Sequence, residues 1–221
     1  MSSAVGSDAA APSLSERAYT EIEELIITLK LAPGSALSEA ELALHLGIGR
    51  TPVREALQRL ARERLVMVLP RRGVVVSEIN VASQLRLLEV RRELERLIAR
   101  SAARRANDEQ RARFRAIAAG FETAASADDG IAFMRTDLEF NQLCSSASHN
   151  EFAANAMSLM HGLSRRFWYL HHAHAADMPR TAKLHAAIAR AIATADEDRA
   201  GAASDKLLDL IEKFTFDTLQ G

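Results

Sequence analysis

The sequence predicts a mainly α-helical protein in two parts: three short helices with a β-hairpin at the N-terminus, then an antiparallel bundle of about six helices. Two observations predict this fold class. Residues 14–78 alternate amphipathic helical segments with turn signals and end in two β-prone runs. In residues 79–221, apolar side chains recur at helical spacing and no strand pattern interrupts them. At 221 residues, 48% of them hydrophobic, the chain is long enough to form two cores.

The first two helices have clear stop and start signals. The first carries apolar residues at helical spacing, namely Ala18, Ile22, Leu25, Ile26 and Leu29. Residues 31–34, Leu-Ala-Pro-Gly, end it, because the residue before proline is disfavoured in the α conformation and glycine permits a turn. Ser38 and Glu41 then have the spacing of a capping box and open a second helix.

The third helix is the most informative segment. It is predicted to begin at about Thr51-Pro52, after a turn at Gly47, since proline suits the first helical position. Arg50, Thr51 and Arg54 lie at or near its start, off its apolar face. That face consists of Val53, Ala56, Leu57 and Leu60. Guanidinium and hydroxyl groups at the exposed start of a short helix are what a reader of the DNA major groove needs.

Two β-prone runs follow, at residues 65–69 and 74–76. Between them lie Arg71, Arg72 and Gly73, so the pair predicts a hairpin with a basic, glycine-containing tip. Three short helices followed by such a hairpin form a winged helix-turn-helix domain over residues 14–78.

Local charge supports contact with nucleic acid. The whole chain is formally −1, so its total charge indicates nothing about partners. Residues 50–72, however, hold seven arginines against two glutamates, whereas residues 14–48 hold two basic residues against six glutamates. A basic strip on an otherwise acidic unit is typical of phosphate contact. The alternative, a solvated helix face, is disfavoured by the turn, the helix start and the hairpin that accompany the strip.

Residues 14–78 resemble the DNA-binding domain of the GntR family of bacterial transcription regulators. The resemblance rests on Leu31-Ala32-Pro33-Gly34, Leu37-Ser38-Glu39, Leu42-Ala43, Leu46-Gly47, Arg50-Thr51-Pro52-Val53-Arg54-Glu55-Ala56-Leu57, Leu60, Leu65-Val66 and Pro70-Arg71-Arg72-Gly73. It implies a regulator that binds double-stranded DNA as a dimer, on a pseudo-palindromic operator. The implied DNA contacts are Gly49, Arg50, Thr51, Arg54, Arg71, Arg72 and Gly73, with Arg50 and Arg54 in the major groove and Arg72-Gly73 in the minor groove.

Two positions depart from the family pattern. Gly49 stands where the family usually has Ser or Thr, whose hydroxyl often touches a phosphate. Arg64 replaces the usual glycine before the wing. The first departure is expected to remove at most one hydrogen bond, and neither is expected to disturb the fold.

The rest of the sequence argues against a secreted, a membrane-spanning and a disulfide-bonded protein. Residues 1–13 are small and polar and are expected to be a disordered tail without the character of a signal peptide. No apolar run approaches the roughly 20 residues that span a bilayer, so no membrane partner is expected. Cys144 is the only cysteine, which excludes an intrachain disulfide and a cysteine-based zinc site. The expected location is the cytoplasm.

Helices are expected from about residue 80 to Arg105 and at about 108–125, 128–147, 150–174, 178–195 and 197–219. This half resembles the effector domain, called FCD, of the FadR-type subfamily of GntR regulators. The residues that carry the resemblance are Arg91-Arg92-Glu93-Leu94-Glu95, Asp137-Leu138-Glu139-Phe140-Asn141, Asn150, His185-Ala186-Ala187-Ile188, Ala191-Ile192 and Asp196. The resemblance implies a homodimer whose bundle, residues 79–221, binds a small-molecule effector and alters DNA affinity.

Many relatives hold a divalent metal with an Asp, a His four residues later and one His from each of the last two helices. The matching positions here are Asp137, Asn141, His185 and Leu207. Asparagine is a poor ligand for zinc or nickel and leucine is none, so no resident metal or other cofactor is expected.

A pocket without metal needs other polar anchors. Arg91 or Arg92 on one helix and Arg165 or Arg166 on another are candidates for binding an effector carboxylate, and surface or intersubunit ion pairs are the alternative. Asn141 and His185 would supply neutral hydrogen bonds. The aromatic pair Trp168 and Tyr169 would form a pocket wall or only pack.

Other functions are less consistent with the sequence. A metal site at His171, His172 and His174 is disfavoured, because neighbouring histidines on a helix point in different directions. His45, His149 and His161 are expected to be surface or packing residues. Asp137 and His185 could be an acid–base pair, but no nucleophile motif or phosphate loop accompanies them, so no enzyme is expected. A constitutive DNA-binding protein whose bundle only dimerises remains the alternative.

Overall fold

The computed structural model describes residues 12–175 and 177–218, except for the side chains of residues 172–175. Most of the tail expected to be disordered, residues 1–11, lies outside the described residues. The chain forms two compact units. One runs to Ile26 and continues over Lys30–Ser77, and the other comprises residues 27–29 and the chain from Glu78 onward.

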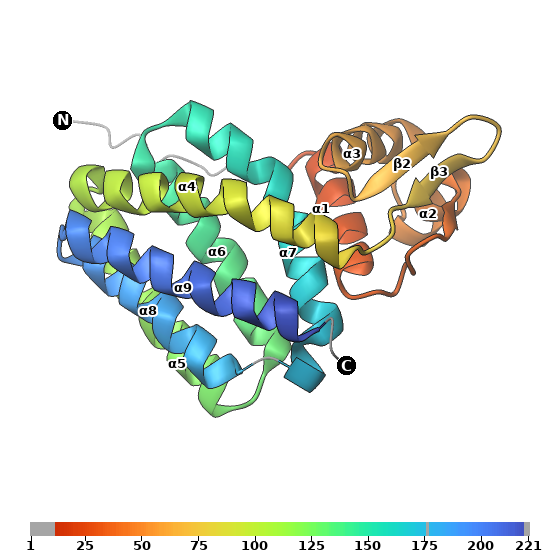
Figure 1. Ribbon diagram of the computed structural model, residues 1–221. Coiled ribbons are helices and arrows are strands. Elements are labelled where there is room, and N and C mark those ends of the chain that lie inside the picture. Colours follow the sequence, from red (N-terminus) through yellow and green to blue (C-terminus); the bar gives the residue numbers. More distant parts are fainter. Residues whose placement is uncertain (1–11, 176, 219–221) are drawn as a thin grey trace, which may run out of the picture. The chain divides into compact units, whose positions relative to one another are not determined.

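The N-terminal unit contains α1 (Leu14–Ile27), α2 (Glu39–Leu46) and α3 (Arg50–Arg62) (Figure 1). Its core is formed by the apolar faces of these helices, including Ile22, Ile26, Leu42, Leu46, Val53, Leu57 and Leu60. The predicted apolar stripes are therefore confirmed, with one exception. Leu29 lies beyond the end of α1, at a φ of 59° that no helix contains.

Helix ends in this unit depend on local hydrogen bonds. The Ser38 hydroxyl accepts from the Glu41 N–H at 3.3 Å and caps α2, which is one half of the predicted capping box. Gly47 ends α2 in the left-handed conformation, at φ 64°. Helix α3 begins at Arg50, one residue earlier than predicted, which places Pro52 third in the helix. Proline is tolerated there because the first N–H groups of a helix have no intrahelical acceptor.

The predicted hairpin is formed by β2 (Val66–Leu69) and β3 (Gly73–Val76), which pair antiparallel with Leu69 opposite Gly73. A further strand, β1 (Ala36–Leu37), was not predicted. It pairs antiparallel with β3, which gives the strand order β1-β3-β2. Two residues are too few to show an alternating pattern, so only the tertiary pairing defines this strand.

The second unit is the expected helical bundle. Its six described helices are α4 (Val81–Arg105), α5 (Asp108–Ser126), α6 (Gly130–Ser148), α7 (Glu151–Ala175), α8 (Met178–Ala193) and α9 (Glu197–Asp217). Figure 1 shows α4 and α9 running side by side, and α5 packs against α8. Buried Phe114, Phe121, Ile192, Leu207 and Leu208 belong to one continuous core.

The mainly α-helical class, with an N-terminal winged helix-turn-helix and a C-terminal bundle, is confirmed. Within the described ranges, no helix is both long enough and apolar enough to cross a membrane.

Candidate nucleic-acid interface and ligand pocket

The start of α3 presents its polar residues to solvent. Val53, Ala56, Leu57 and Leu60 are buried, whereas Arg50, Thr51 and Arg54 are exposed. Gly49 is the N-cap residue, and it supplies no side-chain hydrogen bond to the helix start. The three polar residues named for DNA contact therefore lie together on one accessible helix end.

Arg54 forms an ion pair with Glu39, the first residue of α2. Its Nε donates to both carboxylate oxygens, at 3.0 and 3.2 Å, and its Nη2 donates to Oε2 at 2.8 Å. The hydrogen bond from Arg54 holds the pKa of Glu39 below its ordinary value, and the charge of nearby Arg50 acts in the same direction. The sequence alone does not predict this pair, because its members are 15 positions apart in the chain.

The wing tip also carries exposed positive charge. Arg71, Arg72 and Gly73 are exposed between β2 and β3. Arg71 and Gly73 adopt positive φ angles of 66° and 74°, and the Arg72 N–H donates to the Leu69 carbonyl at 3.2 Å. This tight turn presents two guanidinium groups at the end of a narrow hairpin, a shape suited to a DNA groove.

Arg64, the residue that replaces the family's glycine, has a φ of 60°. It lies between the C-terminal cap of α3 and β2, where its carbonyl accepts from the Ser77 hydroxyl at 2.7 Å. Glycine adopts this left-handed conformation without steric cost, whereas arginine does not. The departure therefore leaves the turn intact at some cost in backbone strain.

A cavity of about 60 Å³ lies inside the bundle. In its lining, His185 Nε2 lies 3.2 Å from Asp137 Oδ1, and His185 Nδ1 lies 2.9 Å from the Thr181 carbonyl oxygen. The imidazole of His185 therefore lies between the Asp137 carboxylate and a backbone carbonyl group. Burial raises the pKa of Asp137, but the hydrogen bond and charge of His185, together with the charge of Arg165, lower it by more, so the net shift is downward.

Five of the seven residues proposed from the sequence to bind an effector line this cavity. They are Arg91, Asp137, Asn141, Arg165 and His185. Arg91 is buried and paired with Glu95, one turn along α4, with Nε 2.6 Å from Oε1. Trp168 stacks on Phe133 at 5.1 Å between ring centroids and also lines the cavity, whereas Tyr169 does not belong to the lining.

Arg92 and Arg166 are not in the cavity lining. Arg92 binds Asp209 at 2.8 Å and Glu212 at 3.0 Å on α9. It belongs to a row of arginines along α4 that pair with acidic residues of α9: Arg92, Arg96, Arg100 and Arg104. Arg166 is buried, and its Nη2 donates to the Glu78 carbonyl at 3.4 Å. Burial lowers the pKa of Arg166 to about 10.

His161 was expected to be a surface or packing residue, but it lines the cavity. Burial and the positive charges of Arg91 and Arg165 outweigh the attraction of Asp137 and lower the pKa of His161 to about 4. The residue is therefore neutral at pH 7. No spacing rule points to His161, because it lies on α7, away from the two family motifs on α6 and α8.

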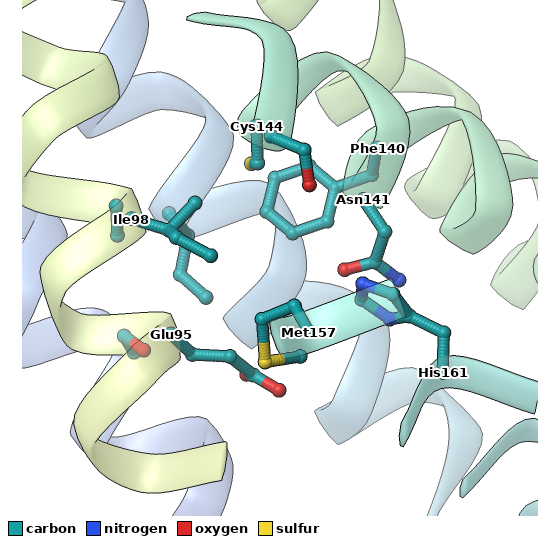
Figure 2. A pocket seen from close by; sticks show the side chains of 11 residues that line it. Glu95, Ile98, Phe140, Asn141, Cys144, Met157 and His161 are labelled. Carbon is teal, nitrogen blue, oxygen red and sulfur yellow. The ribbon is translucent and has the colours of Figure 1, made fainter. Parts of the chain in front are cut away.

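A second, smaller chamber shares Asn141 and His161 with the cavity. Figure 2 shows these two side chains together, with Met157 and Glu95 beside them. The other walls are mostly apolar and include Ile98, Ala99, Phe140, Cys144 and Ile188. Burial raises the pKa of the Cys144 thiol well above its ordinary value, so Cys144 is a neutral part of this wall.

The four metal positions of the family hold only two good metal ligands in this chain, Asp137 and His185. Asp137 and His185 contact each other, and Asn141 lines the same cavity. Leu207, at the fourth position, is only 1% exposed and belongs to the apolar core. Among the residues that the structure describes, no group of three or more His, Cys, Asp or Glu side chains is arranged to hold a metal. A further candidate, the histidine group after Trp168, includes His172 and His174, whose side chains lie outside the described residues.

Comparison with known proteins identifies both halves. The family described as "Bacterial regulatory proteins, gntR family" matches residues 14–76, and the FCD domain matches residues 86–210. A regulator from an unstable DNA locus of Streptomyces ambofaciens is 52% identical over 64 residues, 29% of this chain and 27% of that protein. The repressor RspR of Escherichia coli K12 is 33% identical over 90 residues, 41% of this chain and 40% of RspR. These alignments thus span less than half the length of either relative.

Solved structures agree on the fold. E. coli McbR/YncC superposes with a TM-score of 0.81 over 95% of this chain and all of that chain, at 17% identity. A GntR regulator from Rhodococcus sp. RHA1 gives a TM-score of 0.69 over 93% and 99% of the two chains, at 20% identity. The matched families are transcription regulators and not enzymes. The chain belongs to the GntR family of bacterial transcription regulators and carries an FCD domain of the FadR type as its C-terminal half.

Proposed function

We propose that this protein is a repressor that binds a pseudo-palindromic operator as a homodimer and changes its DNA affinity when a small organic acid enters the bundle. The observation that carries the proposal is the exposed cluster of Arg50, Thr51 and Arg54 at the start of α3. In this proposal α3 enters the major groove, where arginine pairs with guanine O6 and N7. The relative RspR is a transcriptional repressor, which supports repression rather than activation.

The remaining DNA contacts follow from the same docking. Thr51 and the Gly49–Arg50 peptide at the helix start face a phosphate, while Arg71, Arg72 and Gly73 of the wing reach the adjacent minor groove. Selection of bound sequences from a randomised duplex pool tests the proposal. An inverted repeat is the expected outcome, with affinity that falls steeply as salt rises because phosphate contacts release counterions. Failure to select any sequence would contradict it.

Dimerisation is proposed because a two-fold operator requires a two-fold protein. Sedimentation of the full chain at micromolar concentration is expected to give a dimer. A monomer that stays monomeric on the selected DNA would remove this part of the proposal.

The cavity lining favours an anion. It contains two guanidinium groups, one on Arg165 and one on Arg91, which already pairs with Glu95, and one carboxylate, on Asp137. A carboxylate ligand can bind a guanidinium with two parallel hydrogen bonds. The volume of about 60 Å³ holds only a few heavy atoms, so a larger acid must move helices apart. Such movement gives the ligand a physical route to a different conformation of the bundle.

Thermal unfolding with a panel of small carboxylic acids tests this part. One class of acid is expected to stabilise the protein, by about 2.7 kcal/mol at 100 times its dissociation constant. Arg165→Met should abolish the shift. Arg92→Met is the matched control, because Arg92 pairs with α9 outside the cavity lining. If no acid or other metabolite gives a shift, the protein is the constitutive DNA-binding alternative, whose bundle only dimerises.

The proposed effector binds without a resident metal. Asp137 and His185 alone would leave a transition metal mostly hydrated and weakly held. Elemental analysis of protein purified without a histidine tag is expected to find no stoichiometric zinc or nickel. A stoichiometric metal that is lost in His185→Ala would contradict this.

A further inference from the structure

The ion pair between Glu39 and Arg54 has a defined geometry. Glu39 is the first residue of α2, and Arg54 lies on the exposed face of α3. The carboxylate accepts hydrogen bonds from the edge of the guanidinium that carries Nε–H and one Nη2–H. The three donor–acceptor distances lie between 2.8 and 3.2 Å. Two bonds along one edge fix both the position and the plane of the guanidinium.

The pair leaves the outer edge of Arg54 available. A guanidinium has five N–H donors, and Glu39 uses the one on Nε and one of the two on Nη2. Glu39 does not use the other Nη2–H or the two Nη1–H groups, so these three donors can bind a further acceptor. One hydrogen from each of these two nitrogens forms the parallel fork that matches O6 and N7 of guanine.

Stability does not account for this pair. The Arg54 side chain is 61% exposed and that of Glu39 is 31% exposed. Ion pairs that water can reach contribute little to folding, because solvent screens them and long side chains lose freedom. A carboxylate beside the arginines of a DNA-binding surface also repels phosphate, which opposes binding to any duplex.

We propose that Glu39 is a positioning residue that holds Arg54 ready to read a guanine in each half of the operator. The inference rests on the proposed function, since it assumes that α3 enters the major groove. Glu39 then raises specificity in two ways. It orients the guanidinium fork before DNA arrives, and its negative charge weakens binding to sequences that offer no guanine at that position.

The test compares Glu39→Gln with the wild type by selection from a randomised duplex pool. Wild-type protein is expected to require a guanine at one position of each half-site, and Arg54→Ala should lose that requirement. Glu39→Gln should lose it in part, with about a tenfold lower preference for guanine at that position, equal to about 1.4 kcal/mol. Its affinity for unrelated duplex DNA should rise a few-fold, because one negative charge has been removed.

Two further variants separate positioning from charge and from folding. Glu41→Gln removes the same charge from the same turn of α2, and Glu41 has no ion pair among the described residues. It should raise binding to unrelated DNA without changing the guanine preference. Glu39→Asp keeps the carboxylate and should restore part of the preference. Unchanged thermal unfolding of each variant shows that the fold is intact.

Other outcomes would overturn the inference. If Glu39→Gln keeps the full guanine preference and behaves like Glu41→Gln, Glu39 contributes charge only. If it alters a different base position, one that Arg54→Ala leaves unchanged, Glu39 reads a base itself. If the wild type selects no sequence at all, the proposed DNA-binding function fails and the positioning role fails with it.

Discussion

The two units use arginine in opposite surroundings. In the N-terminal unit, Arg50 and Arg54 stand on an exposed helix end, and Arg71 and Arg72 on an exposed turn. In the bundle, Arg91 and Arg166 are buried. An exposed arginine is available to a partner and adds little to the fold, whereas a buried one is costly unless it is paired. This difference separates the expected consequences of mutation. Changes on the DNA-binding surface should affect DNA binding much more than stability, and changes inside the bundle should affect folding first.

Leu207→Ala should have the largest effect on stability. Leu207 is 1% exposed in the bundle core, at a position where relatives place a metal ligand. Removing a buried leucine side chain leaves a cavity and costs about 2–5 kcal/mol. Thermal or urea unfolding of the full chain measures the loss. A cost below about 1 kcal/mol would show that Leu207 is not a packed core residue and would weaken the contrast between the units.

Arg54→Ala, in contrast to Leu207→Ala, should weaken DNA binding and leave stability nearly unchanged. If Arg54 contacts a base, its loss should cost about 1–3 kcal/mol of specific DNA binding, or about 5- to 150-fold in affinity, and relax specificity at one position. Thermal unfolding should be nearly unchanged, because the pair with Glu39 is solvent-exposed. Fluorescence anisotropy with the selected operator measures the first effect. Unchanged affinity and specificity in a folded variant would remove Arg54 from the DNA interface.

The sequence was sufficient to predict the helices and the hairpin, but not the two-residue strand β1 or the geometry of the cavity. Helix α3 and the hairpin were readable because caps, turns and apolar spacing act within a few residues. The cavity brings together Asp137 on α6, His161 on α7 and His185 on α8, and packing alone sets those distances. Arg91 and Arg92 could not be ranked for the same reason. Adjacent residues on α4 point in different directions, and the packing of α4 against the other helices decides that Arg91 lines the cavity while Arg92 pairs with α9.

Arg64→Gly should stabilise the N-terminal unit slightly. At φ 60° the arginine bears a left-handed strain of about 1–2 kcal/mol, which glycine removes. Glycine loses about 0.5–1 kcal/mol more conformational freedom on folding, so the net gain should be about 0.5–1 kcal/mol. Arg64→Ala is the control, because it removes the charge and keeps the Cβ. A glycine variant that is less stable than the alanine variant by about 0.5–1 kcal/mol, the entropic cost of glycine alone, would show that the backbone at residue 64 is not strained.

Gly49→Ser should have the smallest effect on stability and a separate effect on DNA binding. Gly49 caps α3 with extended backbone angles, φ −67° and ψ 160°, which serine also adopts. A Cβ added there would meet its nearest neighbour, Pro52 Cδ, at 3.7 Å, an ordinary contact. The hydroxyl can accept a hydrogen bond from an N–H in the first turn, which serine does better than glycine by a few tenths of a kcal/mol. On DNA, the same hydroxyl can donate to a phosphate.

The matched control for that substitution is Gly49→Ala, which adds the Cβ without the oxygen. Alanine is a poorer N-cap than glycine, so this variant should be slightly less stable than the wild type, while serine is slightly more stable. Operator affinity should rise only in Gly49→Ser, by a similar factor on matched and unrelated DNA, because a phosphate contact carries no sequence information. If serine and alanine bind DNA equally well, the family's hydroxyl has no phosphate partner in this protein, and the glycine has removed no contact.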